Sequence, residues 1–264
     1  MRDALQRLPE NIRLLSEGVD ALEQLLRKAE TLDEASVKRA LPFIGLFWLY
    51  ASGVRDILSA RRRDGRALWN APALAALCRP LVDSFVGFFY FGVEQVDESE
   101  ATFRELLLRR HNSFKRAELL KKADQTVPDI AAELPVAIRE AEEAQQQLIA
   151  HPVFASLPRE KASEVKNLRD RFIFEPLQDT WQRAGLPRDL YEVTFRYLSQ
   201  WVHATPYALG QLKYHQADRE DGAVNMNVPV SLSLTCTCLI LDRASRLALP
   251  LEELLPKGFR EFIS

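Results

Sequence analysis

The sequence has few of the residues from which recognisable catalytic motifs are built. Its 264 residues include three cysteines, four histidines and ten scattered glycines. The glycines form neither a phosphate loop nor a dinucleotide-binding spacing, and neither a zinc motif of the H-E-x-x-H type nor a nucleophile elbow is present. Cys236 and Cys238 would point roughly 200° apart on a helix. We therefore expect no metal, no cofactor and no disulfide framework, which fits a reducing cytoplasm.

The sequence also lacks a strong net charge and an apolar leader. Its formal net charge is −2, so no overall field attracts it to nucleic acid or to a membrane. The N-terminal stretch is charged from its second residue. The run "ALPFIGLFWLYASGV" is short for a spanning helix, and "PLVDSFVGFFYFGV" contains Asp83 and directly follows Arg79. We expect no membrane span.

Apolar residues make up 47% of the chain, and they recur with helical periodicity almost throughout. The pattern predicts an all-α bundle of about seven to nine helices, folded as a single domain over 1–264 with a hinge near 151–158. Buried helices at 72–96 and 229–247 are expected at its centre. The other expected helices cover 9–29, 32–63, 97–123, 128–150, 159–174, a short piece around Trp181, and 187–212. Thr31 and Glu34 have capping-box spacing for the second helix, and 214–227 is expected to be an exposed loop.

The helix at 72–96 combines an apolar surface with a polar stripe. At about 100° per residue, Arg79, Asp83, Tyr90 and Glu94 fall within a stripe roughly 60° wide. Gly87 lies in the same stripe and would leave space in its middle. Burying charged groups is costly unless they are paired. The stripe is therefore either a satisfied ion-pair network that fixes helix register, or a polar cleft that binds a ligand.

A second polar constellation lies in "RYLSQWVHATPYAL". Arg196, Ser199, Gln200, His203 and Tyr207 share one helix face there. Pro206 should kink the helix just past His203. A histidine beside a kink, on a face with arginine and serine, could perform acid–base chemistry. The alternative is a solvated polar face opposite a core face.

Residues from both constellations match the sequence pattern of a known family. The pattern R-P-x-x-D (Arg79, Pro80, Asp83), followed later by Y-x-S-x-x-x-H (Tyr197, Ser199, His203), resembles an uncharacterised bacterial all-helical family that is catalogued as a domain of unknown function. The resemblance supplies no reaction. It implies that both constellations face one pocket.

The chain also resembles, more loosely, the HEPN helical domains, many of which are ribonucleases with an R-x4-6-H motif in a dimer cleft. Arg196 and His203 have this spacing, and so do Arg104 and His111. The resemblance implies a metal-independent ribonuclease in a defence or toxin–antitoxin setting. In that interpretation His203 is the acid–base group and Arg196 stabilises the charged transition state.

Two neighbouring segments carry opposite charge. Residues 104–122 have an excess of five positive charges, and residues 124–143 have an excess of five negative charges. The basic segment could bind phosphate groups, or the helices formed by the two segments could pair as a hairpin.

Two functions stay open. The first is a helical binding module, in one alternative a homodimer, that takes an unknown ligand or protein partner in a cleft containing Arg79, Asp83, Tyr90, Glu94, Tyr197, Ser199 and His203. The second is the HEPN-like ribonuclease, with RNA as its substrate and Arg196 and His203 as its catalytic residues.

Overall fold

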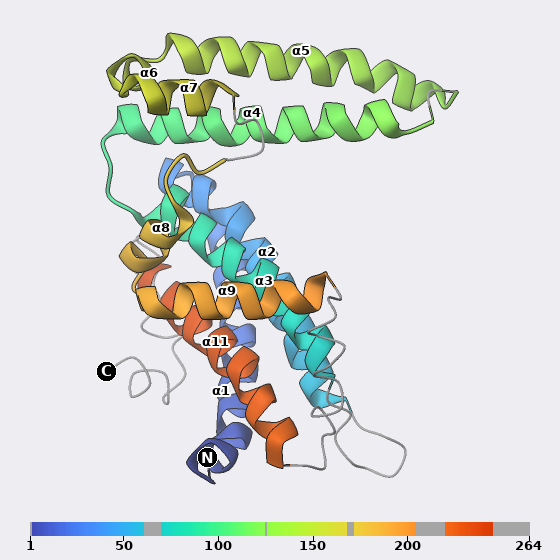
Figure 1. Ribbon diagram of the computed structural model, residues 1–264, viewed down its shortest axis with the longest axis vertical. Helices are drawn as coiled ribbons and strands as arrows, with labels where there is room; N and C mark the ends of the chain where they lie inside the picture. The colour runs from blue at the N-terminus through green and yellow to red at the C-terminus, as the bar shows by residue number, and fades with distance from the viewer. Residues whose placement is uncertain (1, 61–69, 125, 168–171, 204–219, 245–264) are drawn as a thin grey trace. The chain divides into compact units, whose positions relative to one another are not determined.

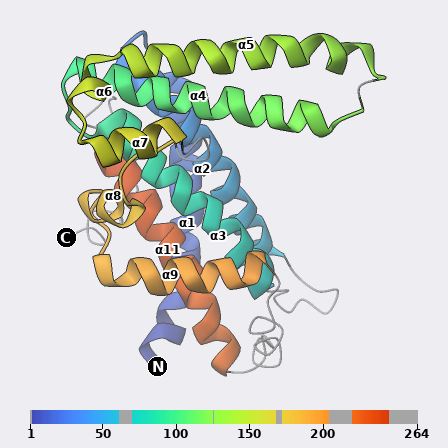
Figure 2. The same cartoon turned by 45° about the horizontal axis from the view of Figure 1, so that its top comes forward.

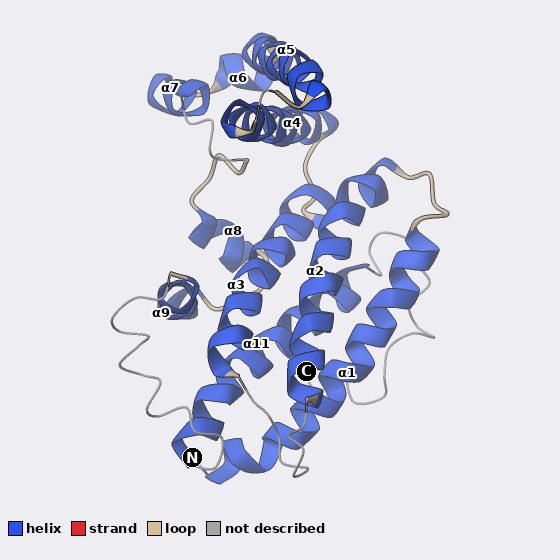
Figure 3. Cartoon of the chain, turned by 90° about the vertical axis from the view of Figure 1, so that its right-hand side faces the viewer, coloured by secondary structure: helices blue, strands red, loops and turns tan. Residues whose placement is uncertain are grey.

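The computed structural model describes residues 2–60, 70–124, 126–167, 172–203 and 220–244 (Figure 1). These residues form helices and no strand, as the colouring of Figure 3 shows. The predicted all-α fold class is therefore confirmed. By contacts within the chain, the protein divides into two compact units: Met1–Val93 with Gln178–Ser264, and Glu94–Leu177. We call them the first and second unit and describe each by itself.

The first unit contains α1 (Arg2–Ala29), α2 (Ala35–Ser59), α3 (Ala71–Phe88), α9 (Arg188–Val202) and α11 (Glu220–Ala244). α2 packs on α1 and α3, α11 packs on α1 and α3, and α9 crosses α3 (Figures 1 and 3). Most of the side chains of α3 are buried, as are those of α11 from Val230 onward that face it. The prediction that these two helices form the centre of the bundle is confirmed.

The start of α2 differs from the expected capping box. Thr31 donates its hydroxyl to the Lys28 carbonyl at 2.7 Å, so it caps the end of α1 instead. α2 begins at Ala35, three residues later than predicted, and the side chain of its N-cap residue Glu34 makes no capping hydrogen bond. The prediction was wrong because a threonine near two helix ends can satisfy either one.

The predicted single helix at 72–96 is in fact two segments. α3 is held at its start by Asn70, whose side chain accepts from the Ala73 N–H at 3.1 Å. After Phe88 the chain widens into the π-helix η1 (Phe89–Val93). A π-turn turns the chain through less than 100° per residue, so side chains beyond Phe88 leave the register assumed for a regular α-helix. Gly92 within η1 permits close packing, because a Cβ there would lie 2.5 Å from the Cβ of Ala40.

The second unit is an antiparallel hairpin of α4 (Glu98–Lys122) and α5 (Pro128–Ala150), with the short helices α6 (Pro152–Ser156) and α7 (Arg159–Asn167) beside it (Figure 2). Asp97 caps α4 by accepting from the Glu100 N–H at 2.8 Å. Arg116 on α4 forms ion pairs with Glu133 and Glu140 on α5. The basic and acidic segments therefore pair with one another, as one of the two alternatives predicted.

The core of the second unit lies where α4, α5 and α7 meet. Phe103, Leu107, Leu148 and Val165 are buried together, with Phe154 and Phe174 packed against them. The predicted helix at 159–174 was too long: α7 ends at Asn167, and residues 172–174 are not helical. α6 also forms inside the stretch that was expected only to break the chain.

The remaining elements return the chain to the first unit. The short helix around Trp181 is α8 (Leu177–Arg183). α9 ends at Val202 with His203 as its C-cap, and the predicted kink at Pro206 lies outside the described residues. The loop expected over 214–227 was wrong in its second part, since α11 begins at Glu220.

Two described helices are long and apolar enough to cross a membrane by length and composition alone. They are Ala35–Ser59 and Pro72–Val93. Of the apolar 18-residue stretch in each, 33% is buried inside the structure in the first helix and 72% in the second. A buried core helix of a soluble protein has the same composition, so this observation is weak, and the absence of a membrane span stays a prediction.

Candidate functional site

Arg79 and Asp83 on α3 form an ion pair that faces α9. The pair is spaced i, i+4 along α3, and the Nη1 atom of Arg79 is buried against the Asp83 carboxylate. The guanidinium lies over the ring of Phe195 on α9, with its central carbon 3.7 Å from the ring centroid. A cation stacked on an aromatic face is stabilised by the ring quadrupole, by about 0.5–2 kcal/mol. Arg79 therefore fixes α9 to α3 and holds its charge at their junction.

The two partners differ in their access to water. The side chain of Arg79 is 18% exposed, whereas that of Asp83 is 44% exposed. Desolvation in the junction raises the pKa of Asp83 above its ordinary value of 3.8, and Arg79 opposes this rise. Asp83 therefore presents an accessible carboxyl group with a raised proton affinity beside a cation that is mostly covered.

Aromatic side chains of α8 and α9 extend this site in a row. The Tyr191 ring stacks on Phe195 with centroids 5.2 Å apart and meets the edge of Trp181 at 5.5 Å. Trp181 is fixed in turn, because its Nε1–H donates to the Pro187 carbonyl at 2.8 Å. Ser199 follows Phe195 by four residues, so it continues the same face of α9. Burial raises the pKa of Tyr191, with the nearby Asp83 adding to the effect and Arg79 opposing it.

The other residues of the predicted stripe lie in different surroundings. Tyr90 belongs to η1, is 1% exposed, and meets the edge of Phe91 with ring centroids 5.0 Å apart. The space expected at Gly87 is filled by Phe43 of α2, since a Cβ on Gly87 would lie 2.4 Å from that ring. Glu94 belongs to the second unit and accepts from Arg104 there. Arg79 and Asp83 are the members of the stripe that the structure brings into direct contact.

The constellation on α9 is divided between two faces. Arg196 is 77% exposed and pairs with Glu192 one turn earlier, at 2.8 Å. Tyr197 packs edge-on against Trp201, with ring centroids 6.2 Å apart. His203 is exposed at the C-cap of the helix. Because Arg196 and His203 are seven residues apart, they lie on the same outer side of α9.

The second arginine–histidine pair of suitable spacing lies in the second unit. Arg104 is 3% exposed and is bound by both Glu94 and Glu100. The ring of His111 packs beside Phe172, with centroids 5.3 Å apart. A buried guanidinium that already holds two carboxylates is not available to a phosphate. This pair therefore has the surroundings of a structural ion-pair network.

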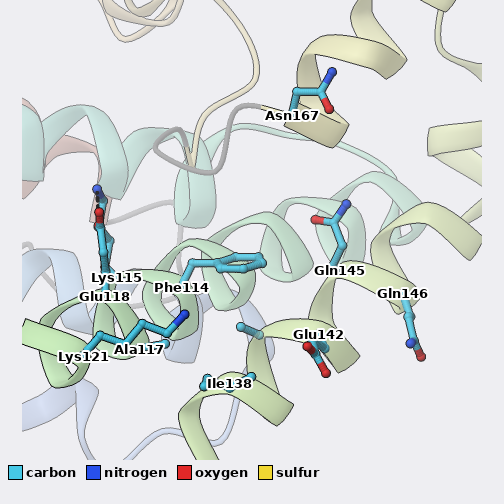
Figure 4. Close-up of a pocket in the computed structure, with 11 residues that line it drawn as sticks. Phe114, Lys115, Ala117, Glu118, Lys121, Ile138, Glu142, Gln145, Gln146 and Asn167 are labelled. Atoms are coloured by element: carbon cyan, nitrogen blue, oxygen red, sulfur yellow. Dashed lines mark hydrogen bonds and ion pairs between the residues drawn. The ribbon is translucent and has the colours of Figure 1, made fainter. Parts of the chain in front are cut away.

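A pocket of about 590 Å³ lies in the second unit, between α4 and α5 beside the end of α7. Figure 4 shows Lys115, Glu118 and Phe114 on one side of it and Gln145, Gln146 and Glu142 on the other, with Asn167 above. Ala117, Ile138 and Ala141 contribute apolar lining. The size suits a small molecule, and the charged lining residues belong to the two oppositely charged segments, but the lining contains no residue of the polar stripe or of the α9 constellation.

Sequence reasoning missed the aromatic half of the candidate site. Tyr191, Phe195 and Ser199 follow one another at intervals of four, and this spacing could have placed them on one helix face. The sequence does not say that this face meets Arg79. Among the described residues, no group of three or more His, Cys, Asp or Glu side chains is placed to hold a metal ion.

Comparison with known proteins adds one finding. Residues 68–223, more than half of the chain, match the model of a family described as a family of unknown function (DUF5677). The chain belongs to this DUF5677 family. The prediction of an uncharacterised family is thereby confirmed. The DUF5677 segment includes α3, η1, α8, α9 and the whole second unit, and therefore both halves of the candidate site. No curated protein and no solved structure matches the chain.

Proposed function

We propose that this protein is a helical binding module, and that the junction of α3 and α9 is its ligand site. The observation that carries the proposal is the pairing of a ring-stacked Arg79, whose side chain is mostly covered, with the accessible carboxyl group of Asp83. Titratable groups with shifted pKa values and a specific charge partner gather at functional sites more often than elsewhere. The Arg79–Asp83 pair lies within α3, and the stacking of Arg79 on Phe195 brings it to α9, so the half-exposed Asp83 carboxyl group stands at the junction of the two helices.

The chemistry of the site indicates the class of ligand. The Asp83 carboxyl group can accept a hydrogen bond from an amine or amide, and the phenol of Tyr191 can donate or accept one. The rings of Tyr191 and Phe195 offer a surface for a flat or apolar part. The ligand is therefore a small molecule, or a short side chain of a protein partner, with a hydrogen-bond donor beside a planar group.

Thermal shift measurements with defined small molecules test the proposal. The probes are free amino acids, nucleosides and polyamines, added one at a time to the full chain. A probe that binds the folded state raises the melting temperature, and the shift grows with the logarithm of the ratio of its concentration to its dissociation constant. We expect the shift to disappear in Asp83→Asn and to persist in Arg196→Ala, which removes an exposed arginine from the outer side of the same helix.

A shift that survives both Asp83→Asn and Phe195→Leu would place the ligand elsewhere and contradict the proposal. If no probe shifts the wild type, titration of the Tyr191 ring resonances by NMR decides the matter. Resonances that do not move with any probe would also count against the site.

A second candidate is the HEPN-like ribonuclease, with His203 as the acid–base group. The specific observation in its favour is the common exposed side of Arg196 and His203. Incubation of the pure protein with mixed RNA tests it, with His203→Ala and Arg196→Ala as the decisive variants and His151→Ala as the control. RNA cleavage that both decisive variants lose supports this activity, and intact RNA in the wild-type reaction rejects it.

A further inference from the structure

The outer face of α2 has an unusual composition for a helix that meets solvent. From Ala40 to Val54 the helix has no charged residue. Only 33% of the apolar 18-residue stretch of α2 is buried within the chain. Leu46 and Leu49 are 45% and 57% exposed. A solvated helix normally carries charged side chains on its outer face, so this face of α2 is suited to contact with another apolar surface.

The geometry of the face is regular. At about 100° per residue, Lys38, Pro42, Gly45, Leu49 and Asp56 fall within one stripe roughly 60° wide, and Leu46 lies at its margin. The other sides of α2 are occupied: Arg55 pairs with Asp20 of α1 at 2.8 Å, and Phe43 fills the space at Gly87 of α3. A Cβ added to Gly45 would meet no atom within 4 Å. Gly45 is thus a shallow, open point in the middle of an apolar stripe.

The two ends of the stripe carry opposite charges. Lys38 stands at one end and Asp56 at the other, and their side chains are 62% and 76% exposed. Eighteen residues separate them, which is about 27 Å along the helix, so they cannot pair within one chain. Asp33 contacts Lys38, and Arg55 lies 3.8 Å from Asp56, but neither contact removes the charge from solvent.

We propose that this face of α2 binds the same face of a second copy of the chain, with the two helices antiparallel. A two-fold axis that crosses the outer face at the level of Phe47, whose own side chain is buried on the opposite side, places Lys38 of each copy opposite Asp56 of the other. The same register places Leu49 of each copy over Gly45 of the other, so that the large side chain enters the open point. The face is therefore complementary to itself in both charge and shape, as an isologous interface requires.

The charges also discriminate against a lipid surface as the occupant. An anionic membrane attracts basic residues along the whole apolar face and repels an acidic one. Asp56 lies on the stripe itself, where it would oppose membrane contact. In the antiparallel pair it has a partner instead. The contact covers about five turns of one helix, so the interface buries less area than that of an obligate dimer. The fraction of dimer therefore depends on protein concentration.

Molar mass measured by light scattering over a range of protein concentrations tests this proposal with the full chain. We expect the wild-type mass to rise from monomer toward dimer. Lys38→Glu and Asp56→Lys should each return it to monomer, and the double variant should restore the dimer. Restoration cannot come from a contact within one chain, given the distance between the two positions. Leu119→Glu is the control, because it changes a 70% exposed leucine on α4.

Gly45→Leu separates assembly from folding. The open space at Gly45 lets the monomer accept a larger side chain, so we expect an unchanged or higher melting temperature together with loss of the dimer. A wild-type chain that is monomeric at every concentration would overturn the proposal. So would a dimer that survives Gly45→Leu, or binding of the monomer to anionic phosphatidylserine vesicles that Leu49→Glu abolishes.

Discussion

Arg104 is enclosed in the second unit by Glu94 and Glu100, and its Nη1–H donates to Glu94 Oε2 at 2.7 Å. The two acids come from opposite sides of the turn into α4, so the guanidinium joins the residues before the helix to its first turn. Only 3% of the Arg104 side chain is exposed, against 14% for Glu94. The contact therefore has the character of a buried ion pair, whose partners depend on one another.

Arg104→Met should destabilise the protein strongly, because it leaves two carboxylates without their counter-charge. We expect a loss of about 3–5 kcal/mol in the free energy of unfolding, measured by urea denaturation. Arg116→Ala is the matched control on the same helix. Its ion pairs with Glu133 and Glu140 are exposed, so the loss should be below about 1 kcal/mol. Equal losses in the two variants would contradict the interpretation.

Gly92→Ala should destabilise the first unit, whereas Gly45→Ala should not. The new Cβ at Gly92 would meet Ala40 at 2.5 Å from its Cβ and 3.1 Å from its Cα, and backbone cannot move away as a side chain does. We expect a loss of about 1–3 kcal/mol from such overpacking. At Gly45 the space is open, and alanine should stabilise the helix by up to about 1 kcal/mol. Thermal melts of both variants measure the difference.

The raised pKa of Asp83 predicts a particular pH dependence. The folded state holds the Asp83 proton more tightly than the unfolded state, so this group favours folding below 3.8, and that contribution is lost as pH rises through its higher folded pKa. Asp83→Asn removes the proton equilibrium. The stability of the wild type relative to this variant should therefore rise as pH falls from 7 toward 4. A relative stability that falls over the same range would show that the pairing with Arg79 outweighs desolvation.

The three cysteine thiols should resist alkylation in the native protein. Cys78, Cys236 and Cys238 are buried, and burial raises the pKa of Cys78 and of Cys238 to about 12. The Sγ atom of Cys78 also lies 3.2 Å from the hydroxyl of Ser233. Thiolate is the reactive species, so labelling should occur only at the rate at which the chain opens. Mass spectrometry after iodoacetamide treatment, with and without denaturant, measures it; fast labelling of folded protein would contradict the burial.

The sequence predicts those features that depend on local rules. Acids at the start of α4 and lysines at its end mark its bounds, and the opposite charges of α4 and α5 predict their pairing. The predicted bounds of α4 and α5 agree with the structure for this reason. The predicted start of α2 was wrong because Thr31 caps the end of α1 instead, and the predicted end of α7 was wrong because the helical pattern there is short.

The candidate site was only partly predictable, because its parts meet through tertiary contacts. The spacing of Arg79 and Asp83 predicts their ion pair, and the structure contains it. No local rule says that Phe195 receives the guanidinium or that Phe43 fills the space at Gly87. The π-turn at Phe89–Val93 also breaks the helical wheel on which the position of Tyr90 and Glu94 was based.

The division of the chain has a consequence for biosynthesis. The second unit is one continuous segment, so it can fold as soon as Leu177 has left the ribosome. The first unit cannot, because α1 packs against α11, which is translated last among the described helices. The sides of α1 and α3 that pack against α11 therefore stay uncovered while the inserted segment is synthesised. Apolar surface left exposed in this way favours aggregation of the nascent chain throughout that interval.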